Sequence, residues 1–163
     1  MKKLILFFLI GFSLTAQQRQ KVIFDCDLGD DIDDAYALGY LLTLQDRYEI
    51  LGITTCYGRT DDRAILAQKF LAVTGETHIP VYIGKNTSKS SVRANWYADQ
   101  FYWAKGFKPK ERLEFNNQYR QAIGLPPLKT KGPDATDFIR SQLKKYPGEV
   151  LIFSVGPVTN LAP

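Results

Sequence analysis

Histidine is nearly absent from this chain of 163 residues, which contains one, along with two cysteines and one methionine. The histidine, His78, precedes an expected strand and is interpreted as a surface residue, so the sequence offers no candidate for a catalytic histidine. The cysteines, Cys26 and Cys56, lie at the ends of expected strands. A disulfide between them is geometrically conceivable, but two buried free thiols are the preferred interpretation.

A concentrated charge of one sign is also missing. The formal net charge is +4, and the basic residues do not gather in one stripe, so a nucleic acid polymer is not expected as a partner. The composition, 45% apolar and 13% aromatic, is typical of a globular chain with one core. There is no internal repeat and no low-complexity segment.

The sequence has one long apolar run, residues 4–14, which follows Lys2 and Lys3. The run is too short and too early for a membrane span, and predicts a secretory signal peptide cleaved after Ala16. An uncleaved anchor is the alternative, because Leu14 does not match the small residue that cleavage prefers. We therefore expect residues 1–16 to be removed, residues 17–163 to be secreted or periplasmic, and no stable membrane insertion afterwards.

Strand-like and helix-like segments alternate through most of the remaining chain. We expect strands at 22–27, 50–55, 81–83 and 150–155, and helices at 33–45, 61–74 and 134–146. Gly75 is expected to end the second helix, and Thr159 to cap another at its start. This order predicts an α/β fold, an open, mostly parallel Rossmann-like sheet with helices on both faces. The aromatic residues between 85 and 131 are interpreted as local core.

Six aspartates crowd into ten positions between the first strand and the first helix, although neighbouring carboxylates repel one another. They are Asp25, Asp27, Asp30, Asp31, Asp33 and Asp34. Ligands of open parallel sheets bind outside the carboxyl ends of the strands, which is where these residues fall. Several carboxylates together suit a hard cation, calcium above all and magnesium second.

Three kinds of site could use such a cluster. An EF-hand loop counted from Asp25 would need glycine at its sixth position and glutamate at its twelfth, where Asp30 and Tyr36 stand, so it is excluded. A phosphatase with Asp25 as nucleophile and Asp27 as acid satisfies the spacing. A metal-assisted hydrolase, in which a cation activates water and a carboxylate takes the proton, uses the remaining aspartates as well.

Three stretches carry a resemblance to one family. "DCDLGDDIDDAYAL" resembles the amino-terminal signature of the inosine-uridine preferring nucleoside hydrolases, in which Asp-x-Asp, a glycine and Asp-Asp-Ala precede an apolar helix. "GITTCYG" looks like the end of the family's second strand, and "SVGPVTNLA" looks like its glycine-x-x-threonine-asparagine turn. The resemblance covers residues 21–163.

The resemblance implies a calcium-dependent N-ribohydrolase that gives ribose and free base from small nucleosides or related glycosides. Asp27 would bind calcium and act as the base toward water, and Asp34 would be a second calcium ligand. Val155 would offer its main-chain carbonyl to the metal, and Asp33 would contact ribose hydroxyls. Asp25 would support the site from behind. Formation of a homo-oligomer is left open.

Two departures from the family pattern affect this interpretation. Two extra residues in the turn bring in Asp30 and Asp31, interpreted as a variation at the edge of the site. The family's ribose-binding asparagine falls on Arg59, a bulkier side chain that only donates hydrogen bonds. The alternative function is therefore a non-catalytic or altered-substrate relative that binds a sugar or nucleoside through the calcium site.

Family members run to about twice this length, so the chain is expected to be the amino-terminal part of the fold. Their second half adds a further aspartate ligand. Residues 17–163 alone are accordingly expected to bind calcium weakly and to hydrolyse no nucleoside.

Overall fold

The structure, a computed structural model, describes residues 18–29, 31–85, 114, 117–118, 121–122, 124 and 134–162. The expected signal peptide, Asp30 and the aromatic residues between 96 and 107 lie outside this part. The elements that position the site are β1 (Gln20–Cys26), α1 (Asp33–Leu42), β2 (Tyr48–Thr55), α2 (Thr60–Thr74), β3 (Val81–Tyr82), α5 (Ala135–Lys145), β4 (Val150–Ser154) and the 3₁₀ turn η1 (Val158–Asn160).

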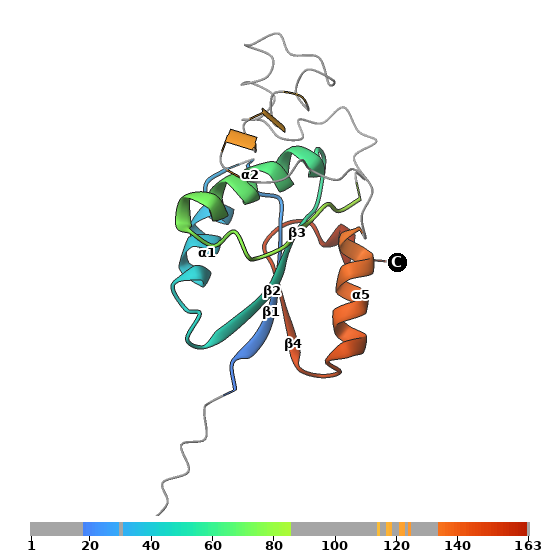
Figure 1. The fold of residues 1–163 in the computed structure, drawn as a ribbon. Helices are drawn as coiled ribbons and strands as arrows, with labels where there is room; N and C mark the ends of the chain where they lie inside the picture. The colour runs from blue at the N-terminus through green and yellow to red at the C-terminus, as the bar shows by residue number, and fades with distance from the viewer. Residues whose placement is uncertain are drawn as a thin grey trace, which may run out of the picture.

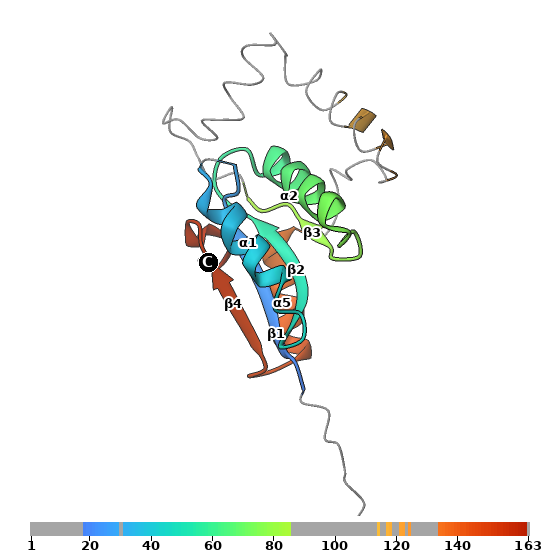
Figure 2. The same ribbon diagram turned by 90° about the vertical axis from the view of Figure 1, so that its left-hand side faces the viewer.

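The strands form one open sheet in the order β3-β2-β1-β4, and every pairing is parallel. Helices α1 and α2 cover one face and α5 covers the other (Figures 1 and 2). The predicted α/β architecture is therefore confirmed. The carboxyl ends of the parallel strands share one edge of the sheet, which is called the rim below and is where ligands of such sheets bind. Because β1 pairs with strands on both sides, its carboxyl end lies in the middle of this rim.

Alternate side chains of β1 enter two separate apolar clusters, as the two-residue period of a strand requires. Val22 and Phe24 pack with Leu38 of α1 on one face. Ile23 packs with Phe138 and Ile139 of α5 on the other. Burying an apolar side chain of this size contributes roughly 1.5–3 kcal/mol, so burial on both faces holds the end of β1 in a fixed place.

The helix ends follow local hydrogen bonding. Helix α1 ends three residues before the predicted Gln45, because the N–H groups of Thr43 and Leu44 donate to carbonyls three residues back and tighten the chain into a turn. Helix α2 ends at Gly75, which adopts a left-handed φ of 81° as predicted. Asp134 caps α5 by accepting a bond of 2.9 Å from the N–H of Asp137.

The predicted N-cap at Thr159 is wrong. Thr159 lies inside η1, where its N–H donates to the Pro157 carbonyl at 2.7 Å, and the residue that precedes the turn is Pro157. The backbone closes a tight turn here, so the threonine side chain has no exposed helical N–H groups to accept from.

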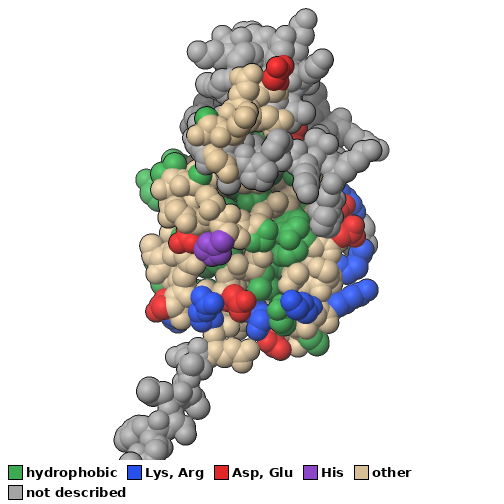
Figure 3. Space-filling view, in the orientation of Figure 1, with side chains coloured by type: hydrophobic (Ala, Val, Ile, Leu, Met, Phe, Trp, Pro, Cys, Tyr) green, Lys and Arg blue, Asp and Glu red, His purple; other side chains and the backbone are tan. Residues whose placement is uncertain are grey.

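The surface carries charges of both signs. On the face shown in Figure 3, basic and acidic side chains are interspersed along the lower half of the molecule. Within the described residues, no helix is both long enough and apolar enough to cross a membrane.

Candidate functional site

The acidic residues lie at the carboxyl end of β1, as the sequence predicts. Asp27 directly follows the strand, and Asp33 and Asp34 form the first turn of α1, where the helix dipole favours negative charge. Asp34 is buried, with 3% of its surface exposed, whereas Asp33 is exposed. The two neighbours on the helix therefore face different surroundings.

The electrostatics of Asp34 are those of a buried carboxylate beside other negative charges. Burial, the charges of Asp27 and Asp33, and a hydrogen bond with Asp27 together raise the pKa of Asp34 to about 7, while the charge of Arg63 lowers it. Half of such groups are protonated at neutral pH. Ionising Asp34 fully calls for a cation close to both carboxylates.

Asp33 has the opposite character. A hydrogen bond with Asp31 and one of 2.9 Å from the N–H of Asp34 lower the pKa of Asp33, so this exposed carboxylate is ionised at neutral pH. Asp31 is exposed, and its hydrogen bond with Asp33 raises the pKa of Asp31. Asp33 is therefore an acceptor ready for hydroxyl donors.

One observation indicates that Asp27 and Asp34 could bind a hard divalent cation. Among the described residues, Asp34 Oδ1 is one of the few buried side-chain oxygens with no hydrogen-bond partner. An orphan carboxylate oxygen beside a second carboxylate is a donor set of the kind that calcium and magnesium prefer. In the same part of the chain, no three or more His, Cys, Asp or Glu side chains form a group that could hold a metal ion by themselves, so main-chain or further oxygens would have to complete the donor set.

Val155 follows β4, the neighbour of β1, so its main chain reaches the same rim. Its N–H donates to the Asp25 carbonyl at 2.9 Å and continues the pairing of the two strands past the end of β4. This bond places Val155 level with the end of β1.

Asp25 is fully buried and held by three side chains from different elements. Thr54 and Asn160 donate to its Oδ1 at 2.6 and 2.7 Å, and Ser154 donates to its Oδ2 at 3.2 Å. Burial raises the pKa of Asp25, and these three bonds oppose the rise. A carboxylate enclosed in this way cannot attack a substrate, so the phosphatase interpretation with Asp25 as nucleophile is wrong.

Asn160 was not among the predicted site residues, although it lies in the "GPVTN" stretch. It is 2% exposed, and its Nδ2 also donates to the Thr55 carbonyl at 2.9 Å, which joins η1 to the end of β2. Gly84 packs against this junction, because a Cβ there would lie 1.9 Å from the Thr55 oxygen and 2.4 Å from Asn160 Oδ1. The rim is therefore a packed polar junction of β1, β2, β4 and η1.

The turn after β2 supplies the second side of the rim. Tyr57 and Gly58 both adopt left-handed backbone angles, with φ of 62° and 64°, and Arg59 follows as the residue before α2. A left-handed φ is uncommon for tyrosine and is kept only where neighbours hold it. No local pattern in the sequence predicts this conformation of Tyr57, whose carbonyl accepts a hydrogen bond from Arg63 of α2.

Both cysteines are buried free thiols, as preferred from the sequence. Burial is the main cause that raises the pKa of the Cys26 and Cys56 thiols, with nearby carboxylates adding to it. Neither is therefore a reactive thiolate at neutral pH.

Gly156 leaves room for Asp27. A Cβ at this position would lie 2.5 Å from Asp27 Oδ1, 2.8 Å from the Asp27 N and 2.8 Å from Cys56 Sγ. Since backbone as well as side chain would have to move, Gly156→Ala is expected to lower the free energy of unfolding by about 1–3 kcal/mol and to displace Asp27.

Denaturant unfolding measures the effect, with Gly39→Ala as control. A Cβ at Gly39 meets its nearest atom, in the Phe70 ring, at an ordinary 3.5 Å. Equal unfolding midpoints for Gly156→Ala and wild type would contradict the close approach to Asp27.

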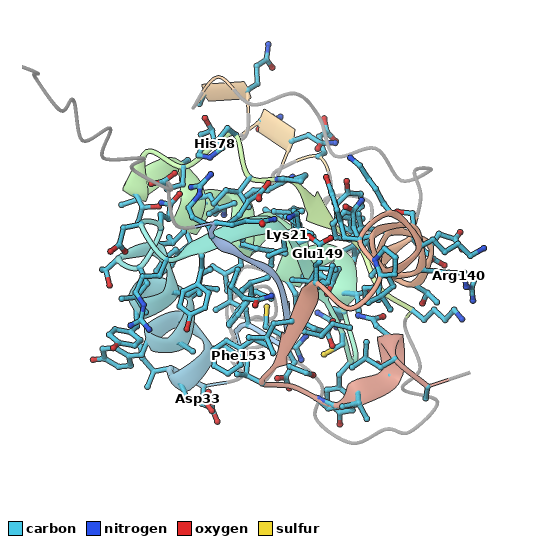
Figure 4. All side chains as sticks on the ribbon, turned by 90° about the horizontal axis from the view of Figure 1, so that it is seen from below. Lys21, Asp33, His78, Arg140, Glu149 and Phe153 are labelled. Atoms are coloured by element: carbon cyan, nitrogen blue, oxygen red, sulfur yellow. The ribbon has the colours of Figure 1, made fainter. Side chains whose placement is uncertain are left out.

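Other features lie away from the rim. His78 is exposed, with its Nδ1 3.4 Å from Glu76, and Figure 4 shows it on the opposite side of the molecule from Asp33. An open, polar crevice lies at the amino-terminal end of the sheet. It is lined by Gln18, Gln20, Arg47, Tyr48, Gly148, Val150 and Leu151. It contains no carboxylate and is not at the end of the strands where ligands of this architecture bind.

Comparison with known proteins assigns the chain to a family. Residues 22–163 match the family described as inosine-uridine preferring nucleoside hydrolase. The chain belongs to this family. The match includes all three of the motifs from which the resemblance was inferred.

Named relatives of this nucleoside hydrolase family member include two from Arabidopsis thaliana. The chain is 32% identical over 146 residues to "Probable uridine nucleosidase 2", covering 88% of this chain and 41% of that protein. It is 31% identical over 151 residues to "Uridine nucleosidase 1", covering 89% and 39%. A protein of Schizosaccharomyces pombe described as uncharacterized is 33% identical over 147 residues, covering 87% and 42%. The chain thus spans about two fifths of the length of these relatives.

Proposed function

We propose that the whole protein is a calcium-dependent nucleoside hydrolase that cleaves the N-glycosidic bond of ribonucleosides to ribose and free base. The observation that carries the proposal is the pair of Asp27 and the buried Asp34, whose unpartnered oxygen and raised pKa mark a place for a cation. Family membership and the names of the two Arabidopsis relatives support the reaction class.

The metal would be held by the carboxylates of Asp27 and Asp34 and by the main-chain carbonyl of Val155. Calcium, when bound, would lower the pKa of a coordinated water and neutralise the repulsion between the two carboxylates. The choice of calcium over magnesium rests on a donor set made of oxygens from separate elements, which suits the more flexible coordination of calcium.

The protein's own groups would do the remaining work. Asp27 would take a proton from the attacking water as its oxygen bonds to C1′ of the ribose. The bond between C1′ and the base nitrogen would break, its electron pair would leave with the base, and the base would gain one proton, which balances the proton that Asp27 takes from the water. Asp33, ionised and exposed, would accept hydrogen bonds from the ribose hydroxyls. Nearby carboxylates would stabilise the positive charge that develops on the sugar ring.

Release of ribose from inosine and uridine, with and without a chelator, tests this proposal. The expected outcome is release that requires calcium.

We further propose that the protein acts outside the cytoplasm as a secreted or periplasmic enzyme of nucleoside salvage, on the basis of the apolar run at residues 4–14. Amino-terminal sequencing of the exported protein, expected to begin at Gln17, tests this location.

Arg59 supports a second candidate function, in which the protein binds a sugar or nucleoside without cleaving it or acts on an altered substrate. Arg59 lies in the left-handed turn after β2, at the position where the family pattern has a ribose-binding asparagine. A guanidinium cannot accept a hydrogen bond from a sugar hydroxyl, whereas an asparagine can both donate and accept.

Arg59→Asn is therefore expected to raise kcat/KM for ordinary ribonucleosides, by about tenfold for one restored sugar hydrogen bond. Steady-state kinetics on inosine, uridine and their 2′-deoxy forms measure the effect. The gain should be smaller for the deoxy forms, which lack one hydroxyl. Kinetics that do not change on any of the four substrates would show that Arg59 is outside the ribose pocket.

A further inference from the structure

Helix α2 buries an arginine directly behind the rim. Arg63 is 1% exposed and is the largest fully buried side chain among the described residues. Arginine is almost never fully buried unless its donors are matched, because removing a guanidinium from water is costly. Its position in the protein interior therefore calls for a specific set of partners.

Those partners include main-chain carbonyls from two different turns. Arg63 Nε donates to the Tyr57 carbonyl at 2.7 Å in the turn after β2. Arg63 Nη1 donates to the carbonyl of Asp27 and, at 3.2 Å, to that of Leu28 in the turn after β1. One planar group thus connects the two turns that form the rim.

The same guanidinium affects the electrostatics and the conformation of these turns. The positive charge of Arg63 lowers the pKa of Asp34, although burial and neighbouring carboxylates raise that pKa by more. Arg63 is therefore close enough to interact with the acidic cluster. Its central carbon lies 5.9 Å from the centre of the Tyr57 ring, within the range of a cation–π contact. Tyr57, with its left-handed φ of 62°, is therefore held by Arg63 at both its carbonyl and its ring.

We propose that Arg63 is a positioning residue that fixes the turn carrying Asp27 relative to the turn carrying Arg59. This inference deepens the proposed function, since the first turn would contribute to the metal site and the second to the sugar site. The fork of the guanidinium is what connects them, because its donors diverge in one plane. The ammonium of a lysine carries the same charge on a single point and cannot span both turns.

Arg63→Lys is the decisive variant, because it keeps the charge and removes the fork. Arg140→Lys is its matched control, since Arg140 lies on the exposed surface of α5, where it bonds with Asp137 at 3.2 Å (Figure 4). The experiment uses the whole protein and has two readouts that do not require hydrolysis. These are amide hydrogen exchange without metal, and the Kd for calcium from calorimetry.

We expect Arg63→Lys to change the exchange of amides in the two turns and not elsewhere in the sheet. In Arg63→Lys, amides of residues 27–29 and 56–59 exchange faster, while amides in the core of β1 and β2 exchange as in wild type. The Kd for calcium rises by about 10–100-fold, the range seen when a residue supporting a metal ligand is replaced. Arg140→Lys resembles wild type in both readouts.

Two results would overturn the proposal. One is wild-type exchange at both turns in Arg63→Lys, which would show that charge alone is what the arginine supplies. The other is faster exchange throughout the sheet, which would show a general contribution to stability. If wild type binds no calcium, the proposed function fails, and the exchange pattern still decides the role of Arg63.

If Arg63→Lys does not fold, nuclear magnetic resonance of the wild-type protein decides the question. The Arg63 Nε–H should exchange slowly with solvent, because the proposal requires it to be held by the Tyr57 carbonyl. Exchange as fast as that of the exposed Arg140 would overturn the proposal.

Discussion

Asp34→Asn is expected to abolish stabilisation of the protein by calcium, and Asp33→Asn is expected to preserve it. Asp34 is the buried carboxylate with an unpartnered oxygen beside Asp27, whereas Asp33 is exposed and bonded to Asp31 and to the N–H of Asp34. A calcium concentration of 100 times the Kd stabilises a protein by about 2.7 kcal/mol. That corresponds to a rise of roughly 5–10 °C in the Tm of a folding unit of about 150–250 residues.

Thermal unfolding with calcium and with chelator measures this difference, and calorimetry gives the Kd of each variant. Asp33→Asn should bind calcium nearly as wild type does but lose affinity for the nucleoside. The assignment of roles is wrong if both variants bind calcium as wild type does, or if Asp33→Asn is the variant that loses it.

The protein in chelator provides an internal check on Asp34. Its folded-state pKa of about 7 is raised above the ordinary value of 3.8, so ionisation of Asp34 destabilises the folded state. This loss is complete above about pH 7, shrinks as the pH falls from 7 toward 4, and disappears only below the ordinary value of 3.8, where Asp34 is protonated in both states. Asp34→Asn, which carries no charge, should therefore be more stable than wild type at pH 8 without metal, and the difference should shrink with falling pH.

Asp27→Asn is expected to lower kcat by about 10²–10⁴-fold, the usual contribution of a general base. An asparagine keeps the size of the side chain and one oxygen but cannot take the proton from water. Because Asp27 is also a proposed calcium ligand, the measurement is made at calcium concentrations that saturate the variant.

Asp46→Asn is the matched control for this prediction. Asp46 is an exposed carboxylate in the turn after α1, away from the rim, and its replacement should leave kcat unchanged. A kcat for Asp27→Asn within about threefold of wild type at saturating calcium would remove Asp27 from the role of base.

The parts of the fold that depend on local pattern were predictable from the sequence. The apolar run of β1, the acidic first turn of α1 and the glycine that ends α2 all have signals within a few residues, and each is found where it was expected. The place of the acidic cluster followed from topology, since the carboxyl ends of parallel strands share one edge.

The features of the site that could not be predicted from the sequence depend on contacts between distant segments. The resemblance implied that Asp25 supports the site from behind, but no local pattern shows that Ser154 and Asn160, 129 and 135 residues further on, donate to it. Arg63 is a polar position on a predicted helix, and no local pattern reveals that carbonyls of two turns surround it.

The most direct test of the proposed chemistry is incubation of the whole protein with uridine in ¹⁸O-labelled water, followed by mass spectrometry. Calcium-dependent hydrolysis predicts ribose that carries one ¹⁸O atom and uracil that carries none, formed in equal amounts with calcium, absent after chelation and restored when calcium is returned. Uridine that stays intact while the protein binds calcium would contradict hydrolysis and favour the binding function, and ribose release that chelation does not change would contradict the metal site.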